Sequence, residues 1–380
     1  MKIQIDFHSV LRRAPLNRSL KVELAKLFKE HLASPHSRTR VTSNNLSVKT
    51  QEHRLMSMMA AFVELRKGGY GIQTPWNLAD KHIRYLVNLW VNEKHQSPGT
   101  VENKLTYLRT LASWVNKHRL VGDMDAYIER PNGYRRHYVA LKDKSWQAAN
   151  IDFEDVVARL ARRDRWVSIQ IELQSAFGLR VQESMMLRPV ECVRLSGHLQ
   201  VIHGTKGGRP RVVPITEAWQ HEILKRAAHL ANPRTLSMIP EPWTLKKWTR
   251  HFYTVLEAEG LSRKEKGVTP HGLRHGYLQR LYEAAAGVPA PIKCSDRRPD
   301  PIIHGHAMQQ VVEAAGHSLA AKATAYISTF ATMERASAPV ISREQALAEI
   351  ERAQGVKSAA AKSLGISRQA LYRILAKAEK

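Results

Sequence analysis

The amino-acid sequence predicts a mainly α-helical protein with a small β component. Three observations predict it. Apolar residues recur at helical spacing between residues 51 and 122, two short β-prone runs flank a glycine-rich turn near residue 206, and a separate helical pattern follows residue 340. With 380 residues, the chain is long enough for two or three domains with cores of their own.

The charge of the chain indicates a polyanionic partner. Its 59 Lys and Arg against 34 Asp and Glu leave a formal net charge of +25. A field of that sign attracts nucleic acid and speeds its capture, whereas a generically basic protein is the alternative. No basic amphipathic anchor, long apolar run or signal-peptide core stands out. Two cysteines, Cys192 and Cys294, are too few for a disulfide framework, so we expect the protein to reside in a reducing cytoplasm. Its basic charge leads us to expect association with the bacterial nucleoid.

Two polar stretches flank the first helical region. Residues 1–50 are predicted to form a basic N-terminal extension, with one short helix near residues 22–28 and a linker at residues 34–45. Residues 126–144 are rich in charge, Gly and Pro, which is typical of a linker between domains.

The region between these stretches, residues 51–125, is predicted to be an all-helical domain. Apolar side chains recur there at helix spacing, and Ser97 with Pro98 marks a helix start. The faces opposite the apolar stripe carry Lys104 and Arg109. We expect these two cations to contact DNA phosphates, with a solvated charged face as the alternative.

Residues 145–335 are predicted to form a mixed α/β domain. His198–His203 and Arg211–Ile215 are β-prone runs on either side of a Gly- and Lys-rich turn, which predicts a hairpin. The stretch at 287–312 contains several prolines in its first half and reads as a surface insertion.

Six side chains in this domain form a candidate catalytic set, in chain order Arg180, Lys206, His271, Arg274, His317 and Tyr326. Guanidinium groups match the oxygens of a phosphodiester in its charged transition state, so Arg180 and Arg274 are assigned to hold it. Lys206 lies in a glycine-hinged turn that could deliver a proton to the departing oxygen. His271 and His317 could donate hydrogen bonds, and the Tyr326 oxygen could attack phosphorus.

Each assignment has a structural alternative. Arg180 could form an ion pair with Glu183, three residues along the same helix, Lys206 could be a solvated hairpin residue, and Tyr326 could be a core residue. A metal site is the alternative for the histidines, which also include His275, His304 and His306. Their spacing matches no familiar zinc motif, and the chain has no nucleotide-binding glycine loop or acidic metal triad. We therefore expect neither metal nor nucleotide cofactor, and an internally packed His275.

The order of the motifs resembles that of the tyrosine recombinases, the family of phage integrases. Gly178-Leu179-Arg180 with Glu183 resembles the first motif box, and His271-Gly272-Leu273-Arg274-His275 the second. Gly316-His317-Ser318 resembles the third box, and Tyr326 the nucleophile. Motifs carry the resemblance over roughly residues 150–330, and the helical pattern carries it more loosely over residues 51–122.

The resemblance implies a helical, SAM-like core-binding domain at 51–125 and an α+β catalytic domain at 145–335 that close as a clamp around double-stranded DNA. It implies cleavage and rejoining through a 3'-phosphotyrosine, with His271 assisting proton transfer and His317 stabilising the phosphate. Integration or excision of a mobile element would use a tetrameric synapse, with an accessory DNA-bending protein as an optional partner. Arg209 and Arg211 are expected to contact DNA phosphates.

Two other functions fit part of this pattern. A type IB topoisomerase shares the same residue types, although the histidine of the second box and the helical domain favour a recombinase. A catalytically silent DNA-binding regulator could keep the fold, although every candidate catalytic residue is present.

The tail, residues 341–380, resembles a Fis-type helix-turn-helix. Ser367 could cap its last helix, and four apolar residues would form its core: Ala360, Leu364, Leu371 and Ile374. Four polar side chains would face DNA: Arg368, Gln369, Tyr372 and Arg373. A helical bundle for subunit contact is the alternative.

Overall fold

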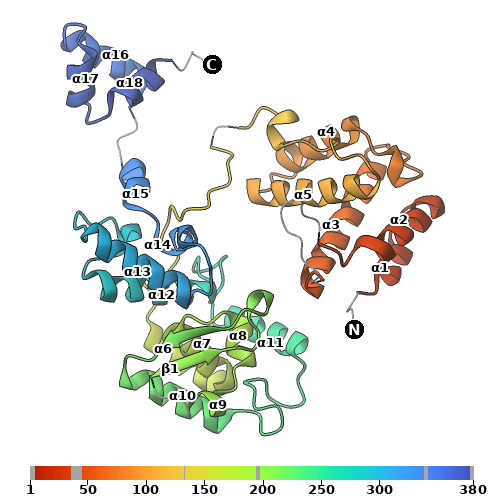
Figure 1. Ribbon diagram of the computed structural model, residues 1–380, viewed down its shortest axis with the longest axis vertical. Helices are drawn as coiled ribbons and strands as arrows, with labels where there is room; N and C mark the ends of the chain where they lie inside the picture. The colour runs from red at the N-terminus through yellow and green to blue at the C-terminus, as the bar shows by residue number, and fades with distance from the viewer. Residues whose placement is uncertain (1–4, 36–44, 132, 194–196, 338–340, 377–380) are drawn as a thin grey trace. The chain divides into compact units, whose positions relative to one another are not determined.

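The chain folds as two compact units, residues 1–136 and 137–380 (Figure 1). The computed structural model describes residues 5–35, 45–131, 133–193, 197–337 and 341–376. Most of the linker predicted at residues 34–45 lies outside these described residues. No helix of the described segments combines the length and the apolar character that crossing a membrane requires.

The first unit is entirely helical in its described parts. Its helices are α1 (Phe7–Arg13), α2 (Arg18–His31), α3 (Val48–Lys67), α4 (Asp80–Asn88) and α5 (Pro98–Trp114), with the short turns η1 (Pro75–Asn77), η2 (Leu89–Glu93) and η3 (Met124–Ala126). Leu24 and Phe28 of α2 are fully buried in one core with Met58 and Trp90. Helices α1 and α2 are therefore part of this helical unit, whereas the sequence predicts a basic extension there.

Side-chain caps explain where the helices of this unit begin. The carboxamide of Asn17 accepts a hydrogen bond from the backbone of Leu20 at the start of α2. Ser97 caps α5, as the sequence predicts, and Pro98 follows at a position where its missing N–H costs nothing.

The second unit begins with a mixed α/β domain, which the sequence predicts to be catalytic. Its larger helices are α6 (Phe153–Arg163), α7 (Arg165–Phe177), α8 (Val181–Met186), α9 (Pro189–Val193), α10 (Ala218–Leu230), α11 (Leu245–Ala258), α12 (His271–Ala286), α13 (Pro301–Ala314), α14 (Thr324–Ile327) and α15 (Phe330–Ser337). Shorter turns are η4 (Lys206–Gly208), η5 (Pro291–Lys293) and η6 (Ala320–Lys322).

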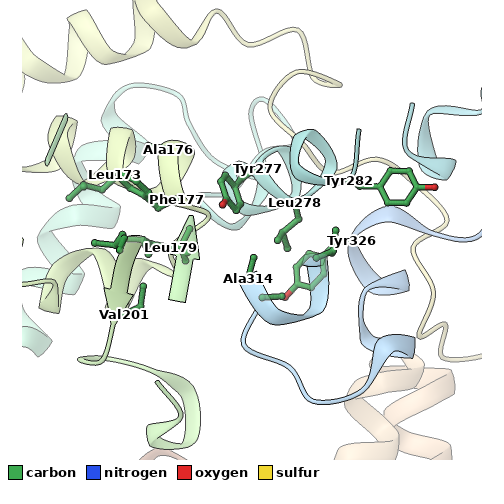
Figure 2. Close-up of a cluster of buried hydrophobic side chains, with 14 of the residues drawn as sticks. Leu173, Ala176, Phe177, Leu179, Val201, Tyr277, Leu278, Tyr282, Ala314 and Tyr326 are labelled. Carbon is green, nitrogen blue, oxygen red and sulfur yellow. The ribbon is translucent and has the colours of Figure 1, made fainter. Parts of the chain in front are cut away.

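Helix α12 is the centre of this domain. Residues 272–279 are all buried, as expected of a helix surrounded by protein. Figure 2 shows Tyr277 and Leu278 of α12 between Phe177 of α7 and Tyr326 of α14. One apolar core therefore joins the first, second and last of the predicted motifs.

The β component is a single antiparallel pair in the described residues. Strand β1 (His198–Val201) pairs with β2 (Arg211–Pro214), with His198 opposite Pro214 and Val201 opposite Arg211. Leu199, Val201 and Val213 point into the core and alternate with exposed residues, which sets the register of the pair. The predicted hairpin is present, with both strands slightly shorter than expected.

Two segments predicted as surface structure are instead packed into the catalytic domain. Asp300 caps α13 and Pro301 begins it, so the later half of the expected insertion is a helix, with Ala307 buried in the core. Ala140, in the expected linker, is buried and donates its N–H to the carbonyl of Thr324 over 2.9 Å. Proline marks a helix start as readily as a loop, which explains the first difference.

The tail forms a small three-helix structure with its own core: α16 (Arg343–Arg352), α17 (Lys357–Ser363) and α18 (Arg368–Leu375). Ala360 and Leu371 are fully buried, Leu364 and Ile374 pack against them, and Ser367 caps α18 through the N–H of Ala370. The predicted fold class is confirmed: a helical domain, an α+β domain with a small sheet, and a helix-turn-helix.

Candidate active site

The first motif places Arg180 at the start of α8. Helix α7 ends at Gly178, whose φ of 58° is left-handed, and a Cβ there would lie 2.4 Å from the ring of Tyr277. The left-handed φ and the close contact with Tyr277 both require glycine at this position. The chain changes direction at Gly178, and α8 starts after Arg180. The guanidinium of Arg180 donates to Glu183 over 2.6 Å and to the carbonyl of Ala315 over 3.1 Å.

The ion pair between Arg180 and Glu183 is therefore formed. The sequence leaves this ion pair as the alternative to phosphate binding by Arg180. Glu183 is fully buried and also receives two hydrogen bonds from Arg211, of 2.6 and 2.7 Å. Burial opposes its ionisation, but the hydrogen bonds and charges of Arg211 and Arg180 outweigh burial and lower the pKa of Glu183 to about 2. Glu183 is thus a buried anion that orients Arg180.

Arg274 of α12 is completely buried and donates to two backbone carbonyls. Its Nη1 bonds to the carbonyl of Gly178, and its Nη2 bonds to that of Ala315 over 2.6 Å. Burial, and the neighbouring Arg180 and Arg211, lower its pKa to about 10, so it is cationic at neutral pH. Because Arg180 and Arg274 share the Ala315 carbonyl, the two guanidinium groups are held side by side.

Tyr326 points its hydroxyl at this pair. The Nε of Arg274 and the Nε2 of His317 each lie 3.4 Å from the phenolic oxygen. The ring is 7% exposed and lies 5.6 Å from the Arg274 guanidinium carbon. A phenol with a cation on one side and an imidazole on the other is suited to lose a proton and attack an electrophile held there.

Three histidines surround Tyr326. The ring centroids of His275, His271 and His317 lie 5.0, 6.0 and 6.1 Å from that of the tyrosine. The pKa of each histidine is lowered to about 4, mainly by burial and further by nearby cations. His271 nevertheless remains partly exposed to solvent. All three are neutral at pH 7, so they can donate or accept a proton.

The histidines differ in their contacts with Tyr326. His317 has the hydrogen-bond distance to the Tyr326 hydroxyl, whereas the sequence assigned the tyrosine proton to His271. His275 is buried and bonds to the backbone of Tyr326, which agrees with the expected internal packing. His304 lies apart from this cluster, because its Nδ1 is 2.8 Å from the Tyr282 hydroxyl.

Lys206 lies at the tip of the hairpin, exposed and without a hydrogen bond or ion pair among the described residues. Gly207 and Gly208 on its far side have φ of 73° and 69°, and a Cβ at Gly204 would lie 2.7 Å from the carbonyl of Gln182 in α8. The base of the hairpin is thus packed closely against α8, while no atom lies within 4 Å of a Cβ added at Gly207 or Gly208 of its tip. Lys206 contributes to the low pKa of His317, which indicates that the two side chains are near each other.

A hollow of about 300 Å³ lies beside Tyr326. Its wall includes His271, His275 and two cations that the sequence analysis missed, Lys144 and Arg263. The catalytic motifs contain neither residue, and only the packing of residues 137–146 against α12 brings Lys144 there. Gly272 permits this contact, because a Cβ at that position would lie 2.4 Å from the carbonyl of Lys144.

Three of the cations predicted to contact DNA have partners within the protein. Arg211 is buried against Glu183. Arg109 donates to the carbonyls of Val121 and Gly122 and to Asp123, and Lys104 lies 4.3 Å above the ring of Trp90. Arg211 is buried, whereas Lys104 and Arg109 are partly exposed, and each of the three has a backbone carbonyl, an aromatic face or a carboxylate within reach.

The other predicted DNA contacts are on the surface. Arg209 is exposed beside the hairpin tip. The exposed face of α18 carries Arg368, Gln369, Tyr372 and Arg373. Within it, the Tyr372 ring lies between Lys357, at 5.2 Å, and Arg368, at 5.8 Å. In the described part of the chain, no cluster of three or more His, Cys, Asp or Glu residues could hold a metal ion.

Comparisons with known proteins show which families the chain resembles. Residues 142–280 match the family described as Integrase, and residues 343–377 match the Bacterial regulatory protein, Fis family. The chain is 30% identical over 195 residues to "Tyrosine recombinase XerD" of Ralstonia nicotianae, which covers 49% of this chain. The chain spans about 61% of that relative's length.

Solved structures show the same fold. A lambda integrase fragment, residues 75–356, in a dimer bound to a COC' core site has a TM-score of 0.52 at 16% identity, covering 80% of this chain and 95% of that one. Another lambda integrase dimer on the same kind of site has a TM-score of 0.50 at 17% identity, covering 86% and 82%. The resemblances to tyrosine recombinases and to a Fis-type helix-turn-helix are thereby confirmed.

Proposed function

We propose that this chain, whose fold and motifs are those of a tyrosine recombinase, is a site-specific recombinase that integrates or excises a mobile element through a 3'-phosphotyrosine on Tyr326. One observation carries the proposal. The Tyr326 hydroxyl lies 3.4 Å from both Arg274 and His317, and Arg274 shares the Ala315 carbonyl with Arg180. A tyrosine hydroxyl, an imidazole and a pair of guanidinium groups therefore converge from four separate parts of the sequence.

The cations define where a phosphate would sit. Arg180 is partly exposed, and Arg274 presents its Nε toward the tyrosine, so a phosphate beside Tyr326 could receive charge-assisted hydrogen bonds from both. These bonds strengthen as negative charge builds on the non-bridging oxygens, which is how fixed donors stabilise a phosphoryl transition state. Glu183 and the Ala315 carbonyl hold the two guanidinium groups in place beforehand.

The proposed step transfers a phosphoryl group between two oxygens. The Tyr326 oxygen forms a bond to phosphorus, the bond from phosphorus to the deoxyribose 5' oxygen breaks, and neutral His317 accepts the phenolic proton. Lys206, on its movable hairpin tip, gives a proton to the departing 5' oxygen. Attack by a 5' hydroxyl on the phosphotyrosine reverses these events, so the bond energy is kept for rejoining.

The proposed partner is double-stranded DNA. The net charge of +25 supports it, as do exposed Lys206 and Arg209 on the hairpin. Exchange between two duplexes breaks four strands, and one nucleophile per chain then requires four subunits. For the tail, the exposed polar face of α18 supports major-groove binding, by analogy with other helix-turn-helix proteins.

A suicide substrate tests the central proposal. Nicked duplexes made from the ends of candidate mobile elements lose a short 5' fragment on cleavage, which traps the covalent complex. The wild-type chain should form a denaturation-resistant protein–DNA adduct, and Tyr326→Phe should bind the same duplex without forming one. An adduct that persists in Tyr326→Phe would reject Tyr326 as the nucleophile. Relaxation of supercoiled plasmid without site preference would instead favour a topoisomerase.

Deletion of residues 341–380 tests the role of the tail. Affinity for the substrate duplex should fall or the footprint should shorten, while adduct formation on a preloaded suicide substrate should persist. An unchanged affinity, footprint and salt dependence would exclude DNA reading by α18.

A further inference from the structure

The hollow beside Tyr326 is lined by cations that the proposed reaction does not use. Its wall includes Lys144, Arg263, Thr269, His271, His275 and Tyr326, and no carboxylate lines it. Asp143, the nearest acidic residue in sequence, accepts hydrogen bonds from the Ser145 backbone and from Gln279, and it does not line the hollow. The space is therefore suited to an anion.

Lys144 is placed there by the rigid packing of its backbone. Its carbonyl lies against Gly272, and the neighbouring Trp146 is buried and donates its indole N–H to the Thr269 carbonyl over 2.8 Å. The side chain itself is exposed and has no hydrogen bond or ion pair within the described segments. The same holds for Arg263, which follows α11 in the loop between residues 258 and 271.

The basic side chains around Tyr326 fall into two separate sets. The cations Arg180, Lys206 and Arg274, and neutral His317, are absent from the wall of the hollow, and Lys144 and Arg263 make no contact with the carbonyl of Ala315. His271 and Tyr326 line the boundary between the two sets. A DNA strand whose scissile phosphate lies at the arginine pair must continue past Tyr326, which brings a neighbouring phosphate toward the hollow.

We propose that Lys144 and Arg263 bind the DNA backbone phosphate next to the scissile one, with Thr269 at the wall of the same subsite. The inference rests on the proposed function, since it needs a strand to cross Tyr326. Burial is the main cause of the low pKa of His271 and of His275, and the charge of Lys144 lowers both further, although Asp143 partly offsets it at His275. A phosphate bound there fixes the strand at a second point beside Tyr326, in a hollow whose wall does not include Lys206.

The first test needs neither a target site nor cleavage. In a Tyr326→Phe background, the full chain is titrated against a fluorescent 30-base-pair duplex of arbitrary sequence at several salt concentrations. Each lost phosphate contact lowers the slope of log affinity against log salt by about 0.9, so Lys144→Gln with Arg263→Gln should lower it by about 2. Lys225→Gln with Arg162→Gln removes the same charge from exposed positions outside the hollow and should keep the parental slope. Equal slopes in both double variants would overturn the proposal.

The second test locates the phosphate. On the mapped suicide substrate, a neutral methylphosphonate replaces each phosphate flanking the scissile one in turn. At one position it should slow wild-type adduct formation about tenfold, as expected for one lost charge-assisted contact, and the Lys144→Gln, Arg263→Gln variant should lose nothing further. Independent, additive losses at every position would overturn the assignment. If the wild-type chain forms no adduct, the proposed function fails while the salt slopes still decide the subsite.

Discussion

Each unit of the chain contains a buried arginine, and the two have similar local environments. Arg54 of α3 is 5% exposed and donates to the carbonyls of Leu32 and Ser34, whereas Arg274 of α12 is fully buried and donates to those of Gly178 and Ala315. Burial lowers the pKa of both to about 10.

The two arginines differ in what faces the remaining nitrogen. The Nε of Arg54 is buried and has no hydrogen-bond partner among the described residues, whereas that of Arg274 lies 3.4 Å from the Tyr326 hydroxyl. In addition, Arg274 shares a carbonyl with a second, partly exposed arginine, Arg180. Burial and a shifted pKa therefore do not distinguish the two arginines. The features that distinguish Arg274 are the adjacent Tyr326 hydroxyl and a second guanidinium, that of Arg180, which solvent can reach.

The largest expected effect comes from exchanging each buried arginine for lysine. Arg274→Lys should slow adduct formation roughly a hundredfold to a thousandfold, because one ammonium cannot hold both carbonyls and still face Tyr326. Arg54→Lys should leave the rate per folded molecule unchanged while lowering thermal stability. Single-turnover cleavage measures the rate, and hydrogen exchange measures stability in each unit. A comparable loss of rate in Arg54→Lys would remove the distinction between the two arginines.

The next effect concerns the carboxylates that hold the cations. Glu183→Gln should destabilise the catalytic domain by about 3 kcal/mol, because it leaves buried Arg211 without its counter-ion. In the first unit, Glu64→Gln should cost less, since its partner Lys94 is exposed to water. Denaturant titration followed by hydrogen exchange in each unit compares the two changes. Equal losses of stability in the two variants would show that the burial of Glu183 does not increase its contribution to stability.

Acid should affect the catalytic domain through His275. Its folded pKa of about 4 lies below the ordinary 6.5, so unfolding takes up a proton between these values and stability falls as pH drops from 6.5 to 4. Relative to pH 7, the loss at pH 5 should be about 2 kcal/mol. His275→Gln should flatten this dependence by that amount, as measured from unfolding midpoints at pH 7, 6 and 5. An unchanged pH profile in His275→Gln would contradict the low folded pKa.

The smallest effect is expected for the surface cations of the first unit. Lys104→Gln and Arg109→Gln should each cost up to about 1 kcal/mol, through a lost aromatic contact and lost carbonyl bonds respectively. Neither should change the salt slope of DNA binding, because both cations already have internal partners. A slope lowered by about 1 for either variant would restore that residue as a phosphate contact.

Local sequence patterns are sufficient to predict much of this molecule. Ser97 and Pro98 mark the start of α5, Ser367 marks that of α18, and alternation around Leu199 marks the hairpin. These signals are readable because helix caps and strand periods involve residues a few positions apart. The ordered motifs also predicted the cluster around Tyr326 that the structure brings together. Lys206 has no hydrogen bond or ion pair with this cluster in the described part of the chain, and only its effect on the pKa of His317 indicates that it lies nearby.

Tertiary structure decided which cations are occupied and which are free. The carbonyl that joins Arg180 to Arg274 belongs to Ala315, 135 residues after Arg180, and a backbone carbonyl leaves no trace in the sequence. The same holds for Lys144, which enters the hollow only because its backbone packs on Gly272. The sequence by itself therefore determined the elements, their order and the chemical groups available for reaction. The partner of each charge was decided by long-range packing, because burial and distance exist only in the folded chain.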